Sequence, residues 1–135
     1  MTARQWLGRG DSARKKIAAL RETKEKLYAE VTGTTPGYAG DVVMHKGESR
    51  KMEKYAEVSE ALDAEEARLL EICRETVEVI RQVEDQRYYR LLLFRYVEGR
   101  SWTEVAERMG YTFVHVTRNL HPAALGEVDK LLKKS

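Results

Sequence analysis

A 35-residue stretch without proline or glycine constrains the fold of this chain more than any other feature. It runs from Ser49 to Val83 and carries apolar side chains on an alternating spacing of three and four residues, which predicts one long helix. The apolar positions are Met52, Tyr55, Leu62, Leu69, Cys73, Ile80 and Val83. Ser59, Glu66 and Thr76 share this face and weaken it. Two compatible arrangements follow: a hairpin with an earlier helix, or a coiled-coil dimer along the length of the helix.

The residues before this helix predict a shorter helix and a loop. A helix is expected over residues 12–31, where Lys24 interrupts an apolar stripe of Ala13, Ile17, Leu20, Leu27 and Val31. Residues 32–47 hold four glycines and Pro36, which predicts a flexible loop. The loop lacks the Gly-Lys-Ser/Thr ending of a phosphate-binding loop, so nucleotide binding is not expected. In the first ten residues, Trp6 and Leu7 either pack back onto the protein or fray.

The C-terminal part begins with a helix over residues 85–98 that is apolar almost all round and ends at Gly99. Such a helix has to be buried on several sides. We therefore divide the chain into two regions. Residues 1–84 form an N-terminal helical hairpin or coiled-coil region, with the loop 32–47. Residues 85–135 form a separate domain.

Residues 101–132 predict two helices joined by a tight turn. Ser101 and Glu104 form a capping box that opens the first helix, and Gly110 closes it. Thr112 then caps a second helix. The inward side chains are expected to be Trp102, Val105, Ala106, Met109, Val116 and Leu120. Pro122 is expected to kink or divide the second helix near His121.

This order of elements predicts an all-α fold that ends in a helix-turn-helix, a motif that places its second helix in the major groove of duplex DNA. The outward side chains of that helix include Phe113, Val114, His115, Thr117, Arg118 and His121. Arg118 is suited to guanine and Phe113 to thymine methyl groups, although Phe113 is equally suited to covering the core. Thr112 lies where backbone N–H groups suit a phosphate. Arg100 and Arg108 flank the helix and are expected to contact the DNA backbone, as are Lys130, Lys133 and Lys134.

Charge and composition exclude several other classes of protein. Residues 87–135 carry nine Lys/Arg against five Asp/Glu, a net +4, whereas residues 49–86 carry six against eleven, a net −5. This distribution points to one polyanion-binding part. With a single cysteine, no apolar run long enough to span a membrane and no secretory signal, the chain is expected to be cytoplasmic. His115 and His121 are isolated, so no metal and no cofactor are expected. No nucleophile stands beside a base, so we expect no enzyme.

The stretch from Leu93 to Ala106 reads LFRYVEGRSWTEVA. Together with Met109-Gly110-Tyr111 and the residues around His115, it resembles phage-encoded transcriptional regulators of the RinA/ArpU type. It is also similar to region 4 of bacterial sigma factors. The first helix, the Thr/Pro/Gly-rich loop and Lys51-Met52 match the N-terminal half of these phage proteins.

The resemblance implies a sequence-specific regulator of phage or prophage late genes that binds duplex DNA. Thr112, Phe113, His115, Thr117 and Arg118 then match the DNA-reading positions. Asn119 and Pro122 depart from the pattern. Two other functions remain open: the small subunit of a phage terminase, and an adaptor that binds RNA polymerase without binding DNA. A homodimer that places two helices on adjacent half-sites is compatible with the first function.

Overall fold

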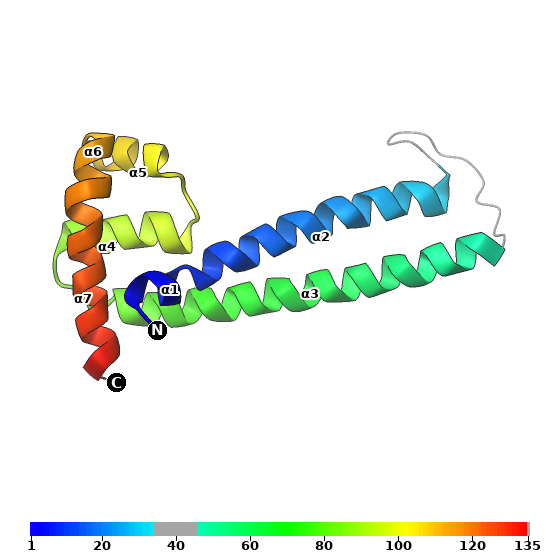
Figure 1. The fold of residues 1–135 in the computed structure, drawn as a ribbon, viewed down its shortest axis with the longest axis horizontal. Coiled ribbons are helices and arrows are strands. Elements are labelled where there is room, and N and C mark those ends of the chain that lie inside the picture. Colours follow the sequence, from blue (N-terminus) through cyan, green and yellow to red (C-terminus); the bar gives the residue numbers. More distant parts are fainter. Residues whose placement is uncertain (34–45, 135) are drawn as a thin grey trace. The chain divides into compact units, whose positions relative to one another are not determined.

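The computed structural model describes residues 1–33 and 46–134, with side chains from residue 50 onward in the second segment. The described residues form helices and contain no strand, so the predicted all-α fold is confirmed (Figure 1). Most of the loop predicted over residues 32–47 lies outside the described residues. None of the described helices combines the length and the apolar character that crossing a membrane requires.

The chain forms two compact units. The hairpin unit comprises residues 13–68, and the C-terminal unit comprises residues 1–12 together with residues 69–135. Helices α2 (Arg9–Thr32) and α3 (Lys46–Ile80) contribute to both units. The core of the C-terminal unit therefore extends beyond the residues 85–135 that sequence patterns assign to it.

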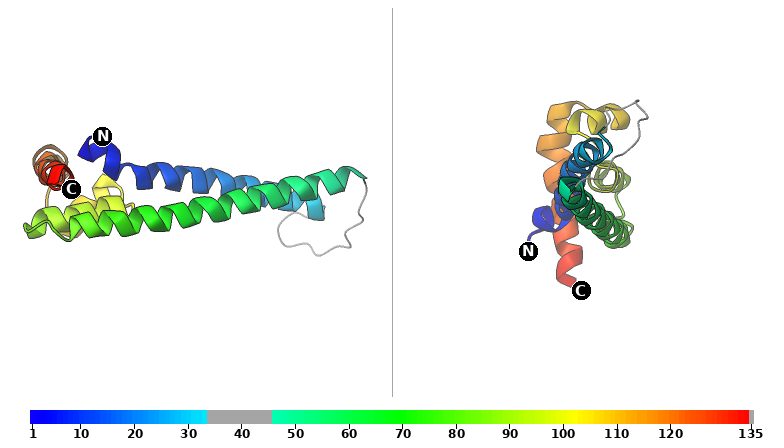
Figure 2. Two further views of the ribbon diagram at one scale, coloured as in Figure 1. Left: turned by 90° about the horizontal axis from the view of Figure 1, so that it is seen from below. Right: turned by 90° about the vertical axis from the view of Figure 1, so that its right-hand side faces the viewer.

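In the hairpin unit, α2 and α3 run antiparallel (Figure 1), and they lie side by side in Figure 2. Arg21 of α2 forms an ion pair with Glu66 of α3 at 3.2 Å. Further along α2, the ring centre of Tyr28 lies 6.1 Å from the ring centre of Tyr55. Lys24, which interrupts the apolar stripe, places its ammonium 5.7 Å from the Tyr55 ring centre, a favourable cation–π contact. These contacts confirm the predicted hairpin.

The C-terminal unit is built around one apolar core. The short helix α1 (Ala3–Leu7) packs on α7 (His121–Lys134), which also contacts α4 (Gln86–Leu92). Ala3 donates its backbone N–H to Asp129 Oδ1 at 2.9 Å, and Leu7 is fully buried. Of the two alternatives for the first ten residues, the structure therefore shows packing. The buried members of this core are Ala3, Leu7, Ile80, Val83, Leu91, Leu92, Val105, Ala106, Met109, Val116, Leu120, Ala124, Leu125 and Val128.

The helix expected over residues 85–98 consists of α4 followed by η1 (Leu93–Val97), a wider π-helical turn. Asp85 caps α4 by accepting a hydrogen bond from the Arg87 N–H at 2.9 Å. Gly99 has a φ of 71°, which lets the Arg100 N–H reach back to the Phe94 carbonyl at 3.0 Å. The predicted end of this helix at Gly99 is confirmed.

The first prediction compares the same substitution at a buried and at an exposed position of the C-terminal unit. Leu7 is 0% exposed and Leu70 is 74% exposed. We expect Leu7→Ala to lower the free energy of unfolding by about 2–5 kcal/mol, because it removes core contacts and leaves a cavity. Leu70→Ala should change it by no more than about 0.5 kcal/mol. Urea denaturation followed by circular dichroism measures both, and equal effects would show that the N-terminal residues are not part of the core.

Candidate nucleic-acid interface

Helix α5 (Trp102–Met109) supports the candidate interface from behind. Val105, Ala106 and Met109 are buried in the core, as predicted. Ser101 caps the helix by accepting a hydrogen bond from the Glu104 N–H at 3.2 Å. The Glu104 carboxylate in turn accepts a hydrogen bond from the Ser101 hydroxyl at 3.2 Å. In a full capping box, this carboxylate would accept from the backbone N–H of the serine.

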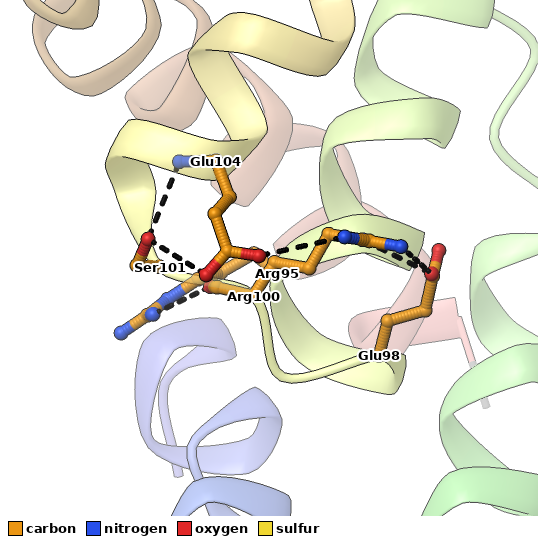
Figure 3. Close-up of polar contacts among 5 residues, drawn as sticks. All are labelled: Arg95, Glu98, Arg100, Ser101 and Glu104. Atoms are coloured by element: carbon orange, nitrogen blue, oxygen red, sulfur yellow. Dashed lines mark hydrogen bonds and ion pairs between the residues drawn. The ribbon is translucent and has the colours of Figure 1, made fainter.

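Arg100 lies just before this helix and is engaged by two carboxylates. Figure 3 shows its guanidinium between Glu98, at 3.0 Å, and Glu104, at 3.4 Å. Its backbone carbonyl accepts a hydrogen bond from Arg95 at 2.9 Å, and the Arg95 guanidinium lies 4.9 Å from the Trp102 ring centre. Arg100 therefore acts within the protein as a link between η1 and α5, and its charge is already paired.

A three-residue turn reverses the chain after α5. Gly110 has a φ of 74°, a left-handed conformation that costs glycine no steric strain. This conformation lets the Tyr111 N–H bond to the Ala106 carbonyl at 3.1 Å and the Gly110 N–H bond to the Glu107 carbonyl at 3.3 Å. This pair of bonds is the Schellman motif, which satisfies the last carbonyls of a helix. Thr112 then caps the next helix by accepting from the His115 N–H at 3.1 Å.

The next helical run consists of α6 (Phe113–His115), η2 (Val116–Leu120) and α7 without interruption. Pro122 therefore does not divide it. A regular α-helix would bring the proline ring against the carbonyl four residues earlier. Here η2 is a π-helical turn in which the His121 N–H bonds to the Val116 carbonyl. The wider turn provides room for the ring, and the helix continues.

The outer surface of this run is exposed at its beginning. Phe113 is 51% exposed and Val114 is 55% exposed, although both are apolar. Arg118 is exposed on the same run and Arg108 on α5. Within the described part of the chain, neither arginine has an ion-pair partner. Val116 and Leu120 are buried behind this surface, as predicted.

His115 and Thr117 are only partly exposed. The Thr117 hydroxyl donates to the Phe113 carbonyl at 2.9 Å. His115 lies against the Tyr111 ring, with 5.2 Å between ring centres, and its Nδ1 is 3.0 Å from the Asn119 amide nitrogen. Sequence reasoning missed the roles of Tyr111 and Asn119. For Asn119 the available signal was its spacing of four residues from His115, because side chains four apart meet on a helix. Tyr111 lies in the turn before the helix, where this rule does not apply.

His121 was predicted to face outward, and this prediction is wrong. It is 7% exposed, its Nε2 lies 2.6 Å from the Tyr96 hydroxyl, and its ring centre lies 4.4 Å from that of Trp102. The π-helical turn is the reason. It places residues five apart on one side of the helix, so His121 follows the buried Val116 into the core.

The environment of His121 keeps its ring neutral. Burial, together with the positive charges of Arg4 and Arg95, lowers the pKa of His121 to about 4. Burial also raises the pKa of Tyr96, so its hydroxyl stays protonated and shares a hydrogen bond with Nε2 of His121. The pair holds η1 against the start of α7.

Comparisons with protein families, with curated proteins and with solved structures found no match. The residues themselves therefore carry the functional argument.

The turn at Gly110 yields a prediction with a matched control. Gly110→Ala should lower the free energy of unfolding by about 1–2 kcal/mol, because alanine is strained in the left-handed conformation. Gly126 lies within α7, where an added methyl group meets open space, so Gly126→Ala should raise it by about 0.5–1 kcal/mol. Thermal or urea unfolding checks both. Opposite signs are expected, and stabilisation by both substitutions would contradict the left-handed turn.

His121 yields a prediction about acid stability. Its folded-state pKa of about 4 lies below the value of roughly 6.5 for an unfolded chain. Between these values the unfolded chain binds a proton that the folded chain excludes, so stability falls as the pH falls from about 6.5 to about 4. His121→Gln should flatten this part of the curve of unfolding free energy against pH. An unchanged slope in the variant would show that His121 protonates freely in the folded protein.

Proposed function

We propose that this chain is a sequence-specific regulator of transcription that binds duplex DNA through the helical run beginning at Thr112. The observation that carries the proposal is the two-sided character of this run. Phe113 and Val114 are about half exposed on one side, while Val116 and Leu120 are buried on the other. An apolar surface left open at the start of a well-supported helix indicates a binding surface.

The chemistry of this surface suits the major groove. Arg118 is free of ion pairs among the described residues and has the planar donor geometry that pairs with guanine O6 and N7. Phe113 and Val114 offer apolar contact to thymine methyl groups. Arg108 on the neighbouring helix is also without an ion pair and is suited to phosphate. The net +4 of residues 87–135 supplies the long-range attraction to a polyanion.

Two of the predicted contacts leave this set. His121 is buried, and the charge of Arg100 is paired with Glu98 and Glu104. The proposed reading set is therefore Phe113, His115, Thr117 and Arg118, with Thr112 and Arg108 toward the backbone. The LFRYVEGRSWTEVA motif supports a narrower version of the proposal, a RinA/ArpU-type regulator of phage or prophage late genes. A homodimer bound to two half-sites is compatible with this function.

The exposed apolar side chains also favour a second candidate. Three neighbouring side chains are each at least 39% exposed: Tyr111, Phe113 and Val114. Such a surface equally suits a protein partner such as RNA polymerase. Salt dependence separates the two functions, since DNA binding releases counterions and weakens steeply as salt rises. Capture of polymerase by a chain that shows no affinity for DNA would favour the adaptor.

The proposed function is tested by selecting bound fragments from random duplex DNA and measuring affinities by fluorescence anisotropy. Arg118→Ala should cost about 1–3 kcal/mol on the selected sequence and much less on random DNA, because it removes a base contact. Lys133 is an exposed residue of the last turn of α7. Lys133→Ala should weaken both DNAs alike and lower the salt slope by about one.

The unaltered chain provides the reference for both variants. Equal losses on selected and random DNA for Arg118→Ala would remove this residue from the reading set. If the selection enriches no sequence and the chain binds duplex DNA only weakly, the proposal itself is overturned.

A further inference from the structure

Three side chains form a stripe at the start of the candidate interface. Tyr111, His115 and Asn119 are spaced four residues apart. The ring of His115 lies 5.2 Å from that of Tyr111 at an interplanar angle of 51°. Its Nδ1 lies 3.0 Å from the Asn119 amide nitrogen. The imidazole is therefore held from both sides, in contrast to the exposed side chains of Phe113 and Val114.

The structure orients the Asn119 amide with its nitrogen toward Nδ1 of His115. An amide NH₂ group is a donor only, so Nδ1 of His115 has to accept. A neutral imidazole has one donor and one acceptor nitrogen. With Nδ1 accepting, the ring proton is on Nε2, and His115 offers its neighbours a donor.

We propose that Asn119 is a positioning residue that holds His115 in its Nε2–H form, so that His115 reads hydrogen-bond acceptors on a base edge. In the major groove, guanine presents two adjacent acceptors, O6 and N7, whereas cytosine presents the N4 amine, a donor. His115 therefore favours guanine and disfavours cytosine at one position of the binding site. This inference rests on the proposed function and adds to it the chemistry of one contact.

The remaining contacts of His115 fit this role. Thr112 fixes the backbone, since its hydroxyl accepts the His115 N–H at 3.1 Å. His115 stays partly exposed, whereas the protein's other described histidine, His121, is buried and bonded to Tyr96. An orienting pair on an exposed stretch limits the loss of side-chain freedom when the DNA binds.

Asn119→Asp is the decisive variant because it keeps the shape of the side chain and reverses the hydrogen bond. A carboxylate only accepts, so Nδ1 then carries the proton and Nε2 becomes an acceptor. Asn119→Leu is the matched control, since it keeps similar bulk and removes the hydrogen bond. The added negative charge of the first variant is repelled by the phosphates and weakens binding to all sequences, whereas the reversed hydrogen bond changes the base preference only at the position that His115 reads.

The first measurement needs no DNA. Nitrogen-15 NMR of the full chain at about pH 8.5, where ordinary histidine rings are neutral, identifies which ring nitrogen of His115 carries the proton. We expect Nε2–H in the unaltered protein, Nδ1–H in Asn119→Asp and a mixture of both forms in Asn119→Leu. A change of packing alone would not exchange the two forms. Nδ1–H in the unaltered protein would overturn the inference.

The second measurement uses the selected binding site at the same pH. The position read by His115 is the one whose base preference is lost in His115→Ala. There the unaltered chain should favour guanine over cytosine about fivefold to tenfold, as one hydrogen bond permits, and Asn119→Asp should favour cytosine. If His115→Ala weakens all sequences alike, His115 contacts phosphate and the inference fails.

The two proposals fail in different ways. Absence of any sequence-specific binding by the unaltered chain would overturn the proposed function, and this inference with it, whatever form the ring takes. Specific binding whose base preference is the same in Asn119→Asp as in the unaltered chain would overturn this inference alone.

Discussion

Val105 and Ala106 of α5 bury their side chains in the same core as Val116 and Leu120 of the following helical run, and only three residues connect the two helices. So short a connection requires the left-handed backbone of Gly110 and the hydrogen bonds that it permits. Once the chain reverses there, the buried pair on each helix decides which side of the second helix faces the solvent. The exposure of Phe113 and Val114 is thus a consequence of apolar packing behind them.

The same core determines where the exposed surface ends. Pro122 excludes a regular helix, and the π-helical turn that accommodates it brings His121 under Val116. Burying an imidazole is costly unless its polar atoms are satisfied, and the Tyr96 hydroxyl provides the partner at 2.6 Å. The start of the helical run is therefore attached to the core by Val116 and Leu120 and by the adjoining His121–Tyr96 pair.

Helical periodicity predicted the inward residues of α5 and of the next run because their positions follow the regular repeat of 3.6 residues. It failed at His121 because one wider turn shifts every later residue around the helix axis, and Pro122 was the only local sign of that turn. Periodicity also left open where Leu7 packs. Helix α1 is far in sequence from α7, and the pattern of its five residues does not indicate which helix it contacts. The contact between His115 and Asn119 required coordinates, since a four-residue spacing alone does not establish a hydrogen bond.

Neighbouring carboxylates, and not the net charge of the chain, determine which arginines are available to bind a polyanion. The Arg100 guanidinium lies between Glu98 and Glu104, so a phosphate would have to displace a carboxylate to bind it. Such exposed pairs are individually weak, yet two of them around one guanidinium, with its carbonyl also accepting from Arg95, favour an internal role. Arg108 and Arg118 have no such competitor within the described residues. Binding a polyanion there would replace water and counterions alone, which is the situation in which charge contributes most to nucleic-acid affinity.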